Sequence, residues 1–347
     1  MKKRINFLDV LRFLAFGMII FYHLVVRLHL SGCYELSKVE VFYSNHNIHM
    51  GTIGVTMFFF ISGLGLMLST KDKFNLKEYL KKRFFKILLP FYIAYSMVFA
   101  VYSVIERGFT FFGNIPLWRF LFTIIGIDGY LYEYGIETFY LIGEWFLGCI
   151  ILMYLLFPVL RKCMIKYRNI TMLISTICYL FLICLDNEIW YVKFLCYLYV
   201  YILGMYIAFS LDRIKRWSLI IAVPIICINL FYPNTLPVAS HLRTLIFTMA
   251  VFVAFSQLEN ILSKCNWLMK FIRMCCNYSF EIYLIHHVII IYFTRRMADR
   301  IHSVIDVVFV FSVELVLMVI FAVVIKFIAN KIANFKANPT FLKLWQE

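Results

Sequence analysis

The sequence is poor in charge. Only 15% of its 347 residues are Asp, Glu, Lys or Arg, whereas soluble domains average about 25%. Hydrophobic residues make up 63% of the chain, above the roughly 45–50% that soluble domains contain. A water-soluble fold cannot bury that much apolar surface, but a lipid bilayer is itself an apolar solvent. The composition therefore excludes an ordinary soluble domain and predicts an integral membrane protein.

Motifs for several kinds of chemistry are also missing. The sequence has no glycine-rich phosphate loop, no serine-hydrolase elbow and no cysteine spacing typical of a metal site. Most of the ten cysteines fall inside apolar runs, and only Cys33 lies in a predicted outer loop, so no disulfide framework is expected. His46 and His49 are three residues apart but have no third ligand nearby. We therefore predict no metal site.

The net charge of +15 comes from short basic clusters that alternate with loops poor in Lys and Arg. This alternation is the positive-inside pattern of membrane proteins, in which basic loops stay in the cytoplasm. Because the charge indicates topology, nucleic acid is not an expected partner. The clusters are Lys2–Arg4, Lys71–Lys86, Arg161–Arg168, Arg213–Arg216, Lys264–Arg273 and Lys326–Lys343.

About ten apolar segments approach the roughly 20 residues that a helix needs to cross a bilayer. An even number of crossings puts both termini on one side, and the basic N-terminus places that side in the cytoplasm. The predicted fold is an all-α, polytopic helical bundle: a single membrane-embedded domain, residues 1–347, in the cell (cytoplasmic) membrane. The predicted segments are 7–30, 51–69, 84–106, 139–160, 169–186, 190–210, 217–232, 242–258, 274–293 and 306–330.

Two outer segments depart from a simple alternation of spans and loops. Residues 107–138 contain an apolar run too short to cross, which predicts an interfacial or re-entrant helix. The predicted outer loop 294–305 carries Arg295, Arg296 and Arg300, against the positive-inside rule. Either the topology differs locally, or these arginines contact an anionic group.

Charged and imidazole side chains in apolar segments are costly, so each needs a reason. The first segment contains Asp9, Arg12 and His23, and the spacing of Asp9 and Arg12 allows them to pair on a helix. Eleven residues separate Arg12 from His23, which is three helical turns plus about 20°, so the two share a face about 16 Å apart. This pattern fits an interior functional site and equally a topogenic anchor with one satisfied histidine.

Two further groups mark other segments. Arg83 and Lys86 enter the third segment from a basic stretch and suit an anionic cytoplasmic ligand, such as the phosphates of a nucleotide-containing donor. A purely topogenic basic loop explains the same residues. In the ninth segment Glu281 precedes His286 and His287 at helical spacing, which indicates either a site or a structural polar network.

Four stretches, in the right order and spanning nearly the whole chain, resemble the acyltransferase-3 family of integral membrane acyltransferases, which modify cell-surface sugars. The first reproduces the family's arginine and histidine separated by ten residues. Each stretch is degenerate alone, but their order and spacing are specific. The stretches run from Phe7 to His23, from Gly54 to Gly63, from Arg83 to Pro90 and from Ser279 to His286, with a supporting match from Trp145 to Pro158.

The chain departs from the family pattern in two places. Many members have a glutamate pair shortly after the tryptophan, where this chain has Ile150 and Ile151, and its nearest acidic residue is Glu144. The family's paired basic motif reads Lys81-Lys82-Arg83 here. No fused esterase-like domain is expected, so the resemblance is to the branch without one.

The resemblance implies transfer of an acyl group, acetyl from acetyl-CoA, to a hydroxyl of a surface polysaccharide or its lipid-linked precursor. His23 is then the expected general base or, alternatively, the carrier of the acyl group. Glu144 and His286 are expected to orient reacting groups or to serve the structure. The basic residues expected to hold the CoA phosphates or steady the thioester oxyanion are Arg12, Lys81, Arg83 and Lys86.

Other functions fit the same residues. A glycan or lipid exporter without covalent chemistry would need a polar pathway and commonly shows internal repeats, which the sequence lacks. Transfer to an amine, or from a longer donor such as succinyl-CoA, is not excluded by any residue. The acceptor and the oligomeric state are left open, although aromatic residues in the outer segments 31–50 and 107–138 are able to stack on sugars.

Overall fold

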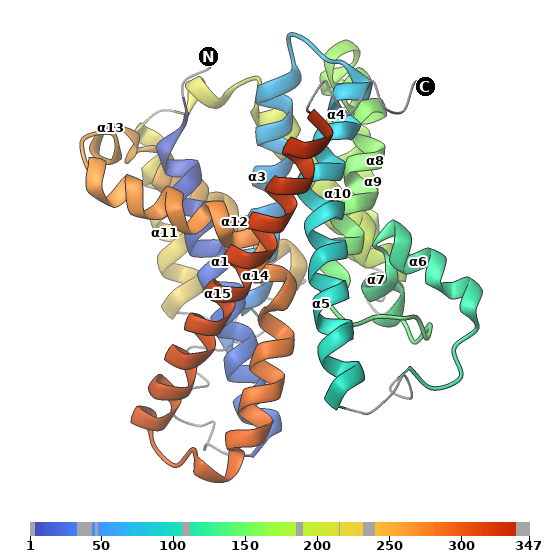
Figure 1. Ribbon diagram of the computed structural model, residues 1–347. Helices are drawn as coiled ribbons and strands as arrows, with labels where there is room; N and C mark the ends of the chain where they lie inside the picture. The colour runs from blue at the N-terminus through green and yellow to red at the C-terminus, as the bar shows by residue number, and fades with distance from the viewer. Residues whose placement is uncertain are drawn as a thin grey trace, which may run out of the picture. The chain divides into compact units, whose positions relative to one another are not determined.

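The computed structural model describes residues 4–32, 44–45, 48–105, 112–184, 190–214, 216–231 and 240–337. Cys33 and His46 lie outside these residues. In the described part the chain is almost entirely helical (Figure 1), and its single strand pair, β1 (Ser44–Asn45) with β2 (Ile48–His49), is only two residues long in each strand. The all-α prediction is confirmed.

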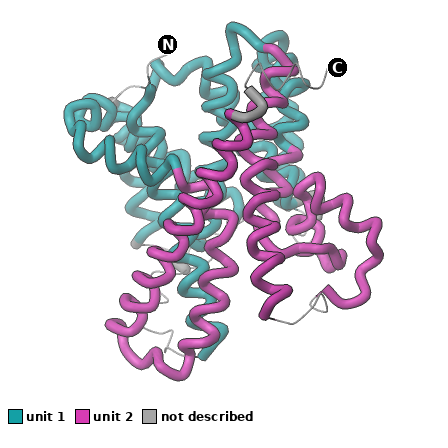
Figure 2. Tube along the Cα trace, in the orientation of Figure 1, with its two compact units in different colours: residues 1–74, 153–277 teal, residues 75–152, 278–347 magenta. Residues whose placement is uncertain are grey.

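The helices cluster into two compact units (Figure 2). Unit 1 comprises residues 1–74 and 153–277, and unit 2 comprises residues 75–152 and 278–347. Two of the three boundaries along the chain fall inside long helices, α8 (Glu144–Lys166) and α14 (Asn266–Met297), and the third falls between residues 74 and 75, outside any helix.

Unit 1 otherwise contains seven α-helices and two 3₁₀ turns among its described residues. They are α1 (Asn6–Leu30), α3 (Met50–Thr70), α9 (Arg168–Leu182), α10 (Trp190–Ile207), η5 (Leu211–Arg213), η6 (Arg216–Ser218), α11 (Leu219–Phe231), α12 (Ser240–Ser256) and α13 (Glu259–Leu262). The described part of unit 2 adds α4 (Leu76–Arg83), the π-helical turn η2 (Phe84–Leu88), α5 (Leu89–Ile105), η4 (Leu117–Arg119), α6 (Phe120–Ile125), α7 (Asp128–Tyr132), η7 (Ala298–Arg300) and α15 (Val304–Ala337).

All ten predicted segments overlap a helix, but the helices differ in length. Six helices in the described part are long and apolar enough to cross a membrane: α1, α3, α4 through α5, α8, α14 and α15. The other four, α9 to α12, are apolar but shorter. A helix of 15 residues such as α9 is about 22 Å long, less than the ~30 Å hydrocarbon core. The helices indicate a multi-pass membrane protein, while ten crossings and cytoplasmic termini stay predictions.

Glycines let the helices of unit 1 approach closely, as helices do in lipid, where packing replaces the hydrophobic effect between them. A Cβ on Gly63 of α3 would collide with the backbone carbonyl of Tyr201 in α10, and one on Gly204 of α10 would collide with that of Phe60. Likewise, a Cβ on Gly54 would lie 2.6 Å from a backbone carbonyl oxygen of α1. The stretch Gly54–Gly63 therefore allows α3 to pack against both α1 and α10.

Replacing Gly63 with alanine is expected to destabilise unit 1, because the clash is with backbone that cannot rotate away. Gly17→Ala is the matched control, since Gly17 is also helical and a Cβ there would meet nothing within 4 Å. In detergent, the thermal unfolding midpoint should fall by several degrees for Gly63→Ala and stay the same or rise slightly for Gly17→Ala. Equal midpoints for the two variants would contradict the packing described.

The segment 107–138, which is predicted to be outside, has no helix of spanning length in its described part, residues 112–138. It contains only η4, α6 and α7, and the apolar side chains of Leu117, Trp118 and Leu121 are exposed on it. Exposed apolar side chains of this kind suit the headgroup region of a bilayer. The prediction of an interfacial or re-entrant segment is consistent with these short helices.

Candidate functional site

The beginning of α1 is built around the carboxylate of Asp9, which is 1% exposed. Arg12 Nη1 lies 3.2 Å from Asp9 Oδ1, as the spacing of the two residues predicts. Arg4 donates from Nε to Asp9 Oδ2 at 2.6 Å, and Arg273 Nε lies 3.7 Å from the same oxygen. Three guanidinium groups share one carboxylate in this Asp9 cluster (Arg4, Asp9, Arg12 and Arg273), which therefore has a net positive charge.

A second acidic residue holds the start of α1. The first backbone N–H groups of an α-helix have no partner within the helix. Glu259 accepts hydrogen bonds from the backbone N–H groups of Asn6 at 3.2 Å and Phe7 at 2.9 Å, and Arg273 donates to the Asn6 side-chain oxygen at 2.5 Å. Glu259 and Arg273 therefore fix the end of the helix that carries Arg12, although they are 253 and 267 positions from Asn6 in the sequence.

A cavity of about 760 Å³ adjoins the Asp9 cluster within unit 1. Gly65 of α3 makes room for the Arg12 side chain there, since a Cβ on Gly65 would lie 3.2 Å from Arg12 Nη2. Three cations and two carboxylates give this lining a net charge of +1, which favours an anionic ligand. The charged residues that line the cavity are Arg4, Asp9, Arg12, Asp72 and Lys73.

His23 lies on the same helix as Arg12, because α1 runs without a break from Asn6 to Leu30. Eleven residues at 1.5 Å per residue separate the two by about 16 Å along the helix axis. The His23 ring is partly buried and packs edge-on against Tyr22, with 5.2 Å between the ring centroids. Its role stays a prediction.

In unit 2, Glu144 begins α8 and pairs with a histidine of α14. The distance from Glu144 Oε1 to His287 Nδ1 is 2.9 Å, and both side chains are partly buried. A neutral His287 that donates its Nδ1 proton to Glu144 keeps its acceptor lone pair on Nε2. The carboxylate thus fixes both the tautomer and the orientation of the imidazole.

The neighbouring His286, which the sequence pattern favours, has a different environment. Its ring is fully buried, and its Nδ1 lies 2.6 Å from the carbonyl oxygen of Tyr283, one turn earlier in α14. Adjacent residues on a helix point about 100° apart, so the two histidines face different neighbours. The structure places His287 in contact with Glu144.

Glu144 has an unusual backbone conformation. Its φ is 40°, and it is the only non-glycine residue with positive φ in the described part of the chain. Gly143 precedes it with a φ of 87°, and the Tyr283 hydroxyl donates to the Gly143 carbonyl. A left-handed conformation costs an L residue about 1–2 kcal/mol. Such strain is found where surrounding contacts hold a functional side chain in place.

Glu144→Gly and Glu144→Gln separate the strain from the ion pair. Both changes remove the carboxylate that holds His287, but only glycine adopts a φ of 40° without strain. Glu144→Gly is therefore expected to be more stable than Glu144→Gln by about 1 kcal/mol, measured as the difference in unfolding free energy in detergent. A glutamine variant at least as stable as the glycine variant would show that the backbone is not strained.

The basic residues Arg83 and Lys86 lie at a local change in helix geometry. The π-helical turn η2 separates α4 from α5 and lies just before Pro90, which has no backbone N–H to donate. Single π-helical turns inside α-helices occur frequently at functional sites. Arg83 is the last residue of α4, and Lys86 is in the middle of the turn.

Lys86 has cationic neighbours from two elements. Arg83 and Lys326 of α15 both lie close enough to Lys86 to interact with its charge. Lys326 in turn pairs with Glu281, at 3.5 Å. Lys81 is exposed near the end of α4. The Lys86 cluster (Arg83, Lys86 and Lys326) is a second basic group, and no local sequence pattern indicates that Lys326 belongs to it.

Asp128 is a buried carboxyl group at the start of α7, in the segment 107–138. Its Oδ1 accepts a hydrogen bond from the Gly129 backbone N–H at 2.9 Å. Burial raises the pKa of Asp128 from 3.8 to about 7, although hydrogen bonds from Gly129 and Thr123 oppose the increase. The carboxyl is therefore able to gain or lose a proton near neutral pH.

The raised pKa of Asp128 predicts a pH-dependent stability. Because the folded state binds this proton more tightly than the unfolded state, the group favours folding most below about pH 4, and this contribution falls as the pH rises towards 7. Asp128→Asn cannot ionise and should flatten the decline of the thermal midpoint between about pH 4 and 7. Glu137→Gln, at an exposed carboxylate in the same segment, should leave the pH profile unchanged. Identical profiles for Asp128→Asn and the parent protein would refute the assignment.

Comparison with known proteins gives one match. The model of a family described as an acyltransferase domain matches residues 5–330, nearly the whole chain. No curated protein and no solved structure matches it. The matched range includes Asp9, Arg12 and Arg273 of the Asp9 cluster, together with His23, the Glu144–His287 pair and the Lys86 cluster. The chain belongs to the acyltransferase-3 family, and it is a membrane acyltransferase.

Proposed function

We propose that the protein is an O-acetyltransferase of the cell (cytoplasmic) membrane. It transfers acetyl from acetyl-CoA to a hydroxyl of a cell-surface polysaccharide or of its lipid-linked precursor. The observation that carries the proposal is the family match over residues 5–330, which includes Arg12 and His23 on one unbroken helix.

His23 is the proposed base. A hydroxyl is a weak nucleophile at neutral pH, so its proton must be removed as its oxygen attacks the thioester carbonyl. The neutral imidazole takes that proton, the ester bond forms, and the CoA thiolate leaves and takes the proton from the imidazolium. In the alternative route His23 carries the acetyl group itself, which would connect a cytoplasmic donor with an acceptor at the opposite face.

The phosphates of the donor are proposed to bind at a basic cluster. The Asp9 cluster is the first candidate, because the adjoining cavity also presents Lys73 and has room for a polyanionic group. Arg12 is held there by Asp9, so its guanidinium is preorganised for phosphate or for a thioester oxyanion. The Lys86 cluster is the second candidate. The exposure of Lys81 supports at most a general electrostatic role.

The Glu144–His287 pair is proposed to position the acceptor hydroxyl. Its geometry is that of a carboxylate that orients an imidazole, and the backbone strain at Glu144 supports a functional reason for the residue. The local hydrogen bond of His286 favours a structural role for that residue. That these groups and His23 face one common cavity stays a prediction.

The surface glycan of cells with and without the protein tests the proposal. Removing the gene should abolish acetyl esters on the glycan, measured by NMR, while the amount of glycan at the surface stays constant. An exporter predicts the reverse, with less glycan at the surface and unchanged acetylation. If succinyl esters were lost instead, the protein would still be an acyltransferase, but its donor would be succinyl-CoA. If N-acetyl groups were lost instead, its acceptor would be an amine.

A further inference from the structure

The end of α14 carries charges that the proposed reaction does not use. Arg295, Arg296 and Arg300 belong to a loop predicted to be outside, where basic residues are unusual. Arg295 and Arg296 are in the last turn of the helix. The Arg296 guanidinium lies over the ring of Tyr292, 4.7 Å from its centroid. That contact fixes where the charge is held.

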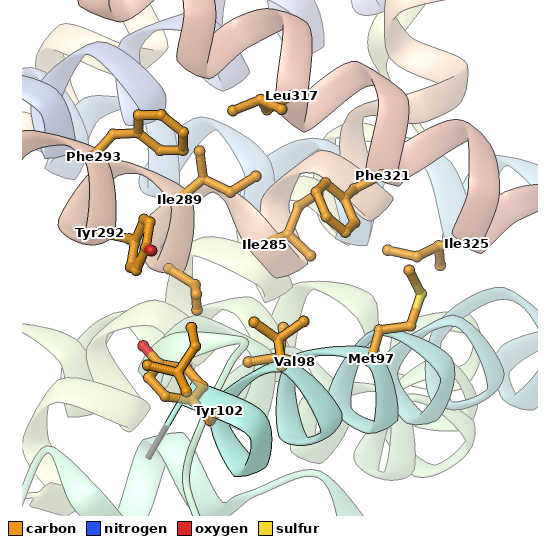
Figure 3. A pocket seen from close by; sticks show the side chains of 13 residues that line it. Met97, Val98, Tyr102, Ile285, Ile289, Tyr292, Phe293, Leu317, Phe321 and Ile325 are labelled. Atoms are coloured by element: carbon orange, nitrogen blue, oxygen red, sulfur yellow. The ribbon is translucent and has the colours of Figure 1, made fainter. Parts of the chain in front are cut away.

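Tyr292 also lines an apolar cavity of about 250 Å³ within unit 2 (Figure 3). Its walls come from α5, α14 and α15, and include Val98, Ile289 and Phe321. Tyr102 and Tyr292 lie at one end of the cavity, and every other lining side chain is apolar. An engineered apolar cavity of about 150 Å³ stays dry and binds benzene, so this larger space is suited to hydrocarbon.

The surroundings of the cavity indicate what reaches it. Val101 and Ile105 of α5 line the cavity and are 50% and 42% exposed, so the cavity opens on the outer face of that helix. All three lining helices are candidate membrane spans. The exposed face of such a helix contacts lipid chains rather than water. Arg296 next to Tyr292 adds a positive charge, which complements an anionic headgroup.

We propose that unit 2 binds one anionic membrane phospholipid, with an acyl chain in this cavity and the phosphate at Arg296. The Tyr292 side chain lies at the same end of the cavity, beside Arg296. The binding involves no acyl transfer, so it is testable apart from the proposed function. It also gives a reason for Arg296 in a stretch predicted to be outside.

Thermal unfolding of the purified protein in detergent, with added lipid, tests the headgroup. Dioleoyl phosphatidylglycerol should raise the unfolding midpoint more than dioleoyl phosphatidylcholine, which has the same chains and no net charge. Arg296→Gln should raise the phosphatidylglycerol concentration needed for half of the effect roughly fivefold, as expected for one cation. Arg295→Gln is the matched control, because residue 295 points about 100° away around the helix, and it should respond like the parent.

A second pair of variants tests the chain. Val101→Phe places a ring at the mouth of the cavity and should weaken the response to both lipids. Val104→Phe, at a position that is 79% exposed and outside the cavity lining, should keep both responses. The unfolding midpoint without lipid establishes that each variant folds. The proposal is overturned if inorganic phosphate alone reproduces the stabilisation, if both arginine variants lose it equally, or if Val101→Phe responds like the parent.

Discussion

Replacing His23 with alanine is expected to slow acetyl transfer about 10²–10⁴-fold, the range for loss of a general base. The proton of the acceptor hydroxyl then has no group to receive it as the thioester is attacked. Binding of acetyl-CoA should change little, because Arg12 of the proposed phosphate site lies about 16 Å away along α1. The measurement is the initial rate of acetyl-CoA consumption by membranes that contain equal amounts of each protein.

His29→Ala is the matched control for His23→Ala. His29 is exposed in the last turn of the same helix, so its removal should leave the rate unchanged. A His23→Ala protein as fast as the parent would remove His23 from the chemistry. The acyl-carrier route makes a further prediction: CoA should be released in a burst of one equivalent when no acceptor is present.

Asp9→Asn is expected to have the largest effect on stability. The change keeps the shape of the side chain but leaves three guanidinium groups around a neutral amide. Charged hydrogen bonds contribute about 1.5–3 kcal/mol, and the partial exposure of the arginines favours the lower end of that range. The free energy of unfolding in detergent should therefore fall by an amount near the lower end of that range. Activity should fall as well, because Arg12 loses the partner that positions it.

Asp72→Asn distinguishes this effect from a general loss of negative charge. Asp72 lines the same cavity but is exposed, so its replacement should change stability by less than about 0.5 kcal/mol. If both variants were equally stable, the buried carboxylate would have no special role in holding α1. If Asp9→Asn lost stability but kept full activity, the position of Arg12 would not matter for the reaction.

Features that depend on neighbours in the sequence could be predicted. The apolar runs identify the helices, and the three-residue spacing of Asp9 and Arg12 predicts their ion pair. The lengths of the four shorter helices, α9 to α12, were less predictable. Hydropathy extends the fifth segment to residue 186, whereas α9 ends at Leu182, because apolar composition does not determine where the backbone leaves the helix.

Contacts between distant residues could not be predicted from one sequence. Arg273 reaches Asp9 and Glu259 caps α1 only because the chain folds back on itself. The rotation of α14 decides whether His286 or His287 meets Glu144, and periodicity within the helix does not determine that rotation. The positive φ of Glu144 is likewise unusual for a glutamate, and only the preceding glycine is a local signal for it.

Membranes incubated with acetyl-CoA labelled in the acetyl group provide the most direct test of acetyl transfer by this protein. Membranes that contain the protein should transfer label to a glycan or lipid-linked glycan and release one CoA for each acetyl transferred. Membranes with His23→Ala should transfer at most about one hundredth of that amount in the same time. If the folded protein transferred no more label than membranes that lack it, with glycan acceptor present, the assignment as an acetyltransferase would be contradicted.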